Sequence, residues 1–144
     1  AKTYILNLPG KTIFFGAASK GCVFLNALGI NINTMQNSYI IDDTKAKQNL
    51  YMPGTGFKIC SRERLTQDEV DNIIILPHNF GNHIANSLRY DENGNNIFTG
   101  SLITMLPKIK VIWLQAFLSK IKETKTIVFV IRYEKVFIST VPCR

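Results

Sequence analysis

The chain has 144 residues, a net charge of +7, 46% hydrophobic residues and 19% charged residues. This composition is typical of one folded globular domain and excludes an intrinsically disordered protein. No apolar run approaches the ~18 residues of a membrane span, and the N-terminus lacks the pattern of a secretory signal. We therefore expect a cytoplasmic protein without a membrane partner.

The positive charge is unevenly distributed along the chain. Residues 1–58 carry +4, residues 59–106 carry −3 and residues 107–144 carry +6. A positive field favours an anionic partner, which here would be a diphosphate ligand or a nucleic acid. The three cysteines are widely spaced and form no C-x-x-C motif, so we expect reduced thiols and neither a disulfide framework nor a zinc site.

The first third of the chain reads as a strand, a glycine turn, a helix and a second strand. The strand Lys11–Phe15 is apolar on both faces, and the helix Ala18–Leu28 repeats apolar residues at helical spacing. Between them, Gly16 permits a tight bend, and Lys20 adds positive charge at the helix start. A second strand, Ser38–Asp42, ends in an acid. This order of elements is used by nucleotide-binding folds, although the turn departs from G-x-G-x-x-G.

A long polar loop follows the second strand. Residues 44–58 have no periodicity and contain Pro53-Gly54, which would fix the return turn. Loops of this length are commonly functional or disordered. In the functional interpretation, Lys47 and Gln48 reach a phosphate.

The second half of the chain continues the alternation of strands and helices. Phe80, Ile84 and Leu88 recur every four residues and predict the core-facing side of a helix. The elements expected are a strand at Ile59–Cys60, a helix that begins with Ser61 as N-cap, a strand at Asp71–Leu76, a helix at Asn79–Arg89, a turn at Asp91–Asn96 and a strand at Ser101–Leu106.

The predicted fold class is α/β, a Rossmann-like open parallel sheet with helices on both faces. We expect residues 1–112 to form this domain and residues 113–144 to pack on it as a C-terminal extension. In the extension, Trp113–Ile121 reads as a helix. Thr126–Ile131 and Val136–Val141 read as two strands of a β-hairpin.

Ligands of open parallel sheets bind beyond the carboxyl ends of the strands. The chain places there the turn 16–21, Asp42 with its loop, and the segment 77–79. Asp42 can accept two hydrogen bonds from ribose-type hydroxyls. Alternatively, it ends the strand as an ordinary acid or pairs with Lys45.

His78 and His83 are five residues apart, so they do not share a helix face and no metal site is expected. His78 at a strand end can act as a general base, or it can be a structural residue at the start of a helix. No nucleophile elbow is present.

These residues resemble the C-terminal domain of the sugar C-methyltransferases, which methylate nucleotide-linked deoxysugars. The resemblance covers about residues 12–107. It is carried by Phe15-Gly16-Ala17-Ala18-Ser19-Lys20-Gly21 with Asn26, by Asp42 followed by Lys47-Gln48 and Pro53-Gly54, and by Asp71–Leu76 leading into His78-Asn79-Phe80 and Ile84. Where the family usually has Trp-Asn and Asp-Glu, this chain has His78-Asn79 and Asn82-His83.

The resemblance implies a domain that helps to enclose a nucleotide diphosphate-sugar. It implies that S-adenosylmethionine and the catalytic base belong to a separate catalytic domain or subunit, so this chain has no cofactor of its own. Whether the chain itself is an enzyme stays open. The expected ligand-binding residues are Gly16, Ala17, Lys20, Gly21, Asp42, Lys47, Gln48, Pro53, Gly54, His78 and Asn79. The alternatives are a stand-alone nucleotide-sugar enzyme with His78 as base, or a basic nucleic-acid-binding protein.

Overall fold

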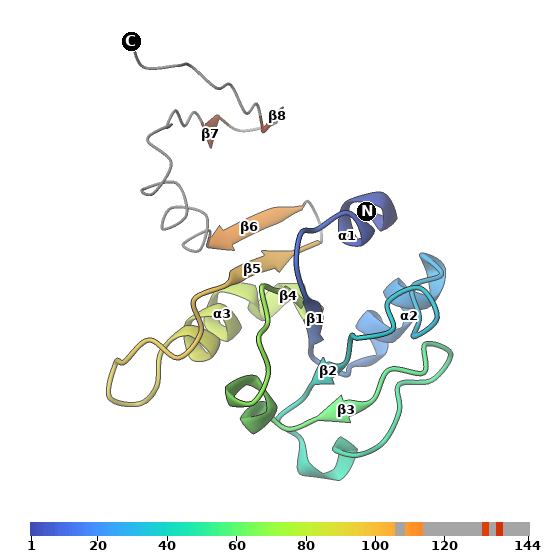
Figure 1. The fold of residues 1–144 in the computed structure, drawn as a ribbon, viewed down its shortest axis with the longest axis horizontal. Coiled ribbons are helices and arrows are strands. Elements are labelled where there is room, and N and C mark those ends of the chain that lie inside the picture. Colours follow the sequence, from blue (N-terminus) through green and yellow to red (C-terminus); the bar gives the residue numbers. More distant parts are fainter. Residues whose placement is uncertain (106–108, 114–130, 133–134, 137–144) are drawn as a thin grey trace.

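A computed structural model of the chain describes residues 1–105, 109–113, 131–132 and 135–136. Helices and strands alternate through most of this range (Figure 1). In chain order the elements are α1 (Lys2–Leu6), β1 (Thr12–Phe15), α2 (Ser19–Ala27), β2 (Ile40–Ile41), η1 (Lys45–Lys47), β3 (Ile59–Cys60), η2 (Arg62–Thr66), β4 (Asn72–Ile75), η3 (His78–Phe80), α3 (Gly81–Arg89), β5 (Ser101–Thr104), β6 (Lys110–Trp113), β7 (Ile131–Arg132) and β8 (Lys135–Val136), where η marks a 3-10 helix.

The main sheet has the order β3-β2-β1-β4-β5-β6, and its first five strands are parallel. The predicted open parallel sheet is thus confirmed. The chain first moves outward from β1 to β2 and β3, then returns to the other side of β1 with β4. The strand order therefore reverses between β1 and β4, which is where ligands of such sheets bind.

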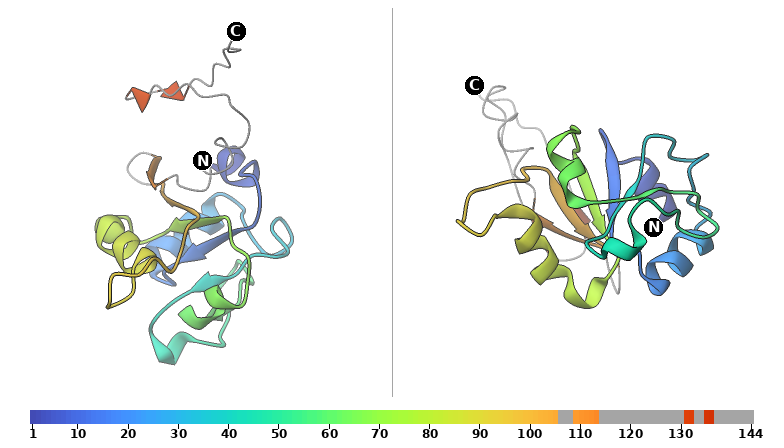
Figure 2. Two further views of the ribbon diagram at one scale, coloured as in Figure 1. Left: turned by 60° about the vertical axis from the view of Figure 1, so that its left-hand side comes forward. Right: turned by 90° about the horizontal axis from the view of Figure 1, so that it is seen from below.

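Helices pack on both faces of the sheet, because the apolar strands bury side chains in both directions. Phe14, Ile40 and Ile74 face a core that includes Leu25 of α2. Their sequence neighbours face a second core that includes Leu88 of α3. Figures 1 and 2 show α2 and α3 on opposite sides of the strands.

The long loop after β2 is packed against the domain. Met52 and Phe57 are buried in the core on the α2 side. The part of the loop next to Tyr51 runs along the outer edge of β3. There, Asn49 N–H donates to the Ile59 carbonyl, and Ile59 N–H donates to the Leu50 carbonyl. The structure therefore does not support the disordered alternative for this loop.

Two predicted helices differ from the structure near their ends. Ser61 precedes a short 3-10 helix, η2, and its side chain makes no capping hydrogen bond to it. Phe80, predicted to face the core with Ile84 and Leu88, is 65% exposed, because it ends the 3-10 turn η3 that precedes α3.

At the C-terminal side, Trp113 does not begin a helix, because Lys110–Trp113 forms β6, antiparallel to β5. The rest of the predicted helix lies outside the described residues. Ile131–Arg132 and Lys135–Val136 pair as antiparallel strands, while most of the two predicted hairpin strands lies outside the described range. None of the helices in the described part of the chain has the length and apolar character needed to cross a membrane.

Candidate functional site

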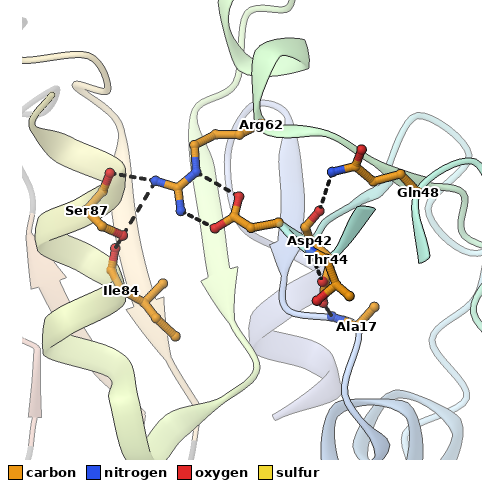
Figure 3. Close-up of polar contacts among 8 residues, drawn as sticks. Ala17, Asp42, Thr44, Gln48, Arg62, Ile84 and Ser87 are labelled. Carbon is orange, nitrogen blue, oxygen red and sulfur yellow. Dashed lines mark hydrogen bonds and ion pairs between the residues drawn. The ribbon is translucent and has the colours of Figure 1, made fainter. Parts of the chain in front are cut away.

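Asp42 follows β2 directly and binds two segments of the chain with its carboxylate. Oδ2 accepts a hydrogen bond from the Ala17 N–H at 2.7 Å and forms an ion pair with Lys47 Nζ at 3.4 Å. Oδ1 accepts a hydrogen bond from the Thr44 N–H at 2.9 Å. Figure 3 shows Asp42 close to Ala17 and Thr44. The carboxylate therefore fastens the loop after β2 to the turn after β1.

The side chain of Asp42 is 10% exposed, yet it is held in the ionised form. Burial acts to raise the pKa of this carboxyl group. The hydrogen bonds from Thr44 and Ala17, together with the charge of Lys47, outweigh burial and leave the pKa below its ordinary value. A buried negative charge with several donors is a stable anchor at neutral pH.

Lys47 and Gln48 point back toward the same turn. Lys47 Nζ donates to the Ala17 carbonyl at 3.0 Å, and Gln48 Nε2 donates to the Asp42 carbonyl at 3.0 Å. Lys45, the alternative partner of Asp42, is exposed in η1. Lys47 forms the ion pair with Asp42 instead. The predicted cluster of Ala17, Asp42, Lys47 and Gln48 is thus brought together.

The two predicted phosphate-turn glycines, Gly16 and Gly21, lie in packing contacts with the end of β4. Gly16 has a φ of 95°, and a Cβ built on it would lie 2.5 Å from the Pro77 ring. Gly21 is buried in α2, and a Cβ there would lie 2.8 Å from Cβ of Leu76. These contacts place the β1–α2 turn directly beside the segment that leads into η3.

Lys20 lies exposed in the first turn of α2. Ala18 is the N-cap of this helix, and no side chain caps its first N–H groups. The first N–H groups of a helix have no partner within the helix and carry a partial positive charge. The turn after β1 therefore ends in an exposed positive region.

Pro53 and Gly54, in the loop after β2, contact α2 farther from its N-terminus. Asn26 Nδ2 donates to the Pro53 carbonyl at 3.0 Å, and the Cys22 thiol approaches the same oxygen at 3.4 Å. Gly54 has a φ of 73°, and a Cβ on it would overlap the Asn26 amide. This pair fixes the return turn, as predicted, but it contacts the middle of α2 and its last turn.

His78 and Asn79 lie in η3, next to the Pro77 ring that contacts Gly16. His78 is half-buried and Asn79 is exposed. Within the described part of the chain the His78 imidazole makes no hydrogen bond. Among the same residues, no group of three His, Cys, Asp or Glu side chains is arranged to hold a metal ion.

Arg62 is a site residue that sequence reasoning missed. Its guanidinium forms two hydrogen bonds with Asp43, the residue after Asp42, and one with the Ser87 carbonyl in α3 (Figure 3). Arg62 is 19 residues from Asp43 and 25 from Ser87 in sequence. No local motif connects positions so far apart, so spacing carried no signal for this contact.

A shallow hollow of about 210 Å³ lies at the outer edge of β3. Gln48, Ser61 and Arg64 are among the residues that line it. Gln48 therefore lines this hollow and also donates a hydrogen bond to the Asp42 carbonyl.

The family described as C-methyltransferase C-terminal domain matches residues 6–107. This range contains all five parallel strands and the whole Asp42 cluster. No curated protein matches the chain. Because the match spans well over half of the sequence, this chain belongs to the family of C-methyltransferase C-terminal domains.

Proposed function

We propose that this chain binds a nucleotide diphosphate-sugar at the C-terminal edge of its parallel sheet, as the substrate-side domain of a C-methyltransferase system. Membership of the family supports a role that accompanies methyl transfer by another domain or subunit. The observation that carries the proposal is the Asp42 cluster, which brings the basic loop after β2 to the start of α2, next to the β1 turn that borders the reversal of strand order.

The diphosphate is proposed to lie against the first turn of α2. The N-terminal N–H groups of α2 have no side-chain cap, and Lys20 is exposed beside them. An anion gains both from the helix dipole and from charge-assisted hydrogen bonds at such a position. Lys47, already at the Ala17 carbonyl, adds a second cation at 40% side-chain exposure.

Asp42 is proposed to contact the sugar in this scheme. A carboxylate has about four acceptor positions. Ala17 N–H, the N–H and side chain of Thr44, and Lys47 already donate to these positions. A sugar hydroxyl is proposed to replace the longest of these contacts, that of Lys47 at 3.4 Å, with Gln48 and His78 at the rim. Asp42 then both anchors the loop and contacts the ligand.

Methyl transfer is assigned to a separate catalytic domain or subunit that binds S-adenosylmethionine. The alternative of a stand-alone enzyme needs a second polar group beside His78 to orient the imidazole. The family match is to the C-terminal domain of C-methyltransferases, so the binding role is the better supported of the two.

Calorimetric titration with uridine diphosphate-glucose and with inorganic pyrophosphate tests the proposal. Lys20→Ala should weaken both probes by about 10- to 150-fold, which corresponds to about 1.5–3 kcal/mol for a charge-assisted hydrogen bond. Lys2→Ala in α1 is the matched control, because it removes an exposed helix lysine outside the site. The proposal fails if neither probe binds at millimolar concentration, or if Lys20→Ala leaves both affinities unchanged.

A further inference from the structure

Arg62, the first residue of η2, contacts three different parts of the chain. Its Nε and Nη2 donate to the two carboxylate oxygens of Asp43 at 3.0 and 2.5 Å. Its Nη1 donates to the Ser87 carbonyl at 2.6 Å (Figure 3). The guanidinium carbon lies 5.4 Å from the centre of the Phe15 ring at the end of β1. One side chain thus joins the loop after β2 to α3 and lies over β1.

The contact at α3 satisfies a group that the helix leaves open. The last four carbonyls of a helix have no partner within it, and α3 ends at Arg89. Tyr90 N–H donates a hydrogen bond to the Asn86 carbonyl, whereas Arg62 donates one to the Ser87 carbonyl. A cation near the C-terminal end of a helix also interacts favourably with its dipole. Arg62 therefore stabilises the last turn of α3.

These contacts require arginine in particular. The planar guanidinium has five donors in a fixed fork, which allows a two-bond contact with Asp43, a third bond to Ser87 and stacking on Phe15. Exposed ion pairs usually contribute little, and Asp43 is 54% exposed. The two-bond geometry and the bond to Ser87 distinguish this pair from an ordinary surface pair. A lysine keeps the charge but loses the fork.

We propose that Arg62 is a positioning residue that holds the loop after β2 and the last turn of α3 in one fixed arrangement at the candidate site. Asp42 fastens the loop to the β1 turn, and its neighbour Asp43 fastens the same loop to α3 through Arg62. Preorganisation of a binding loop lowers the entropy lost when a ligand binds. The effect of Arg62 on a ligand rests on the proposed function, whereas the bridge itself does not.

Hydrogen exchange of the ligand-free chain tests the bridge. Arg62→Lys should accelerate amide exchange about tenfold in the loop 43–50 and in the α3 segment 84–90, as expected for the loss of a charge-assisted hydrogen bond. Arg64→Lys is the matched control, because Arg64 lies in the same 3-10 helix and contacts Tyr39 and Asp68 instead. The inference is overturned if exchange rises in neither segment, in one segment alone, or equally in the control.

A second variant separates coupling from a local effect. Asp43 makes no hydrogen bond to α3 among the described residues. An effect of the Asp43→Asn substitution on α3 must therefore pass through Arg62. Faster exchange in 84–90 in Asp43→Asn supports the bridge, and unchanged exchange there contradicts it. Titration with uridine diphosphate-glucose then gives the consequence for binding. Arg62→Lys should weaken this probe at least about fivefold relative to Arg64→Lys. Absence of binding to the unmutated chain would refute the proposed function and leave the exchange result to decide the bridge.

Discussion

Asp42 keeps a negative charge at a nearly buried position because donors surround it. The Ala17 and Thr44 N–H groups and the Lys47 ammonium group all point at its two oxygens. Each of these donors belongs to a segment without regular secondary structure or to the short helix η1. The carboxylate thus supplies the fixed geometry that strands and long helices supply elsewhere in the domain.

Asp42→Asn should lower stability at neutral pH by about 1–3 kcal/mol, because an amide NH₂ group replaces one of the two acceptor oxygens. Because the pKa of Asp42 is lowered in the folded state, its contribution is fully present above the unfolded-state pKa of about 3.9. It is lost as the pH falls through the lower folded-state pKa. Urea unfolding of both proteins between pH 7 and pH 2 measures this. A stability difference that stays constant below pH 3.9 would contradict the assignment.

At the scale of elements, the contact between the β1 turn and the end of β4 decides where the candidate site lies. Gly16 combines a positive φ with a close contact to the Pro77 ring. The sequence predicts a tight bend and a ligand contact at Gly16. In the structure the close neighbour is Pro77, two residues after β4, so the glycine first serves the packing of the β1 turn beside the segment that follows β4.

Gly16→Ala should therefore destabilise the domain through two effects, backbone strain and overlap with Pro77. Gly94→Ala provides the control, because Gly94 has a φ of 79° and no atom within 4 Å of the added Cβ. The control should cost about 1–2 kcal/mol from strain alone. Gly16→Ala should cost about 1–3 kcal/mol more, the usual effect of overpacking. Equal losses of unfolding free energy in the two variants, measured in urea, would show that the Pro77 ring moves aside without lowering stability.

The sequence predicted the order of elements well, because apolar strands and helical spacing are local signals. The central strands, α2 and α3 lie close to their predicted ranges. The errors occur where tertiary contacts decide. Phe80 fits the helical repeat of Ile84 and Leu88, but it lies in η3 and is exposed. Trp113 fits a helix, but its segment pairs with β5 as β6.

The candidate site was predictable to a similar degree. The topological rule placed the β1 turn, Asp42 and the segment after β4 at one edge, and the contacts of Asp42 and Gly16 join these parts. The rule could not show that Asp42 binds its own chain. Nor could it show Arg62, whose partners are distant in sequence. Side-chain pairing across loops depends on distances that sequence spacing does not contain.

At the scale of the whole molecule, the charge distribution separates two kinds of anionic partner. The segment 107–144 carries +6, while the proposed diphosphate site uses Lys20 and Lys47 near the start of α2. Surface charges separated by more than about 10 Å are largely screened at 0.1 M salt. A small ligand therefore responds to the cations that touch it, whereas a polyanion responds to every lysine along its length.

A variant that replaces Lys120, Lys122 and Lys125 with alanine should bind uridine diphosphate-glucose within about twofold of the unmutated chain, because none of the three belongs to the proposed site. A nucleic-acid binder would behave in the opposite way. Its affinity for a single-stranded oligonucleotide would fall steeply with salt, with a log–log slope of about −0.7 for each phosphate contacted, and loss of three contacts would reduce the slope by about 2. Titrations with both ligands at two salt concentrations distinguish the cases. The outcome that contradicts the proposed site is tight, salt-sensitive oligonucleotide binding that disappears in the triple variant and is unchanged by Lys20→Ala. It would show that the basic C-terminal segment, and not the start of α2, binds the anionic partner.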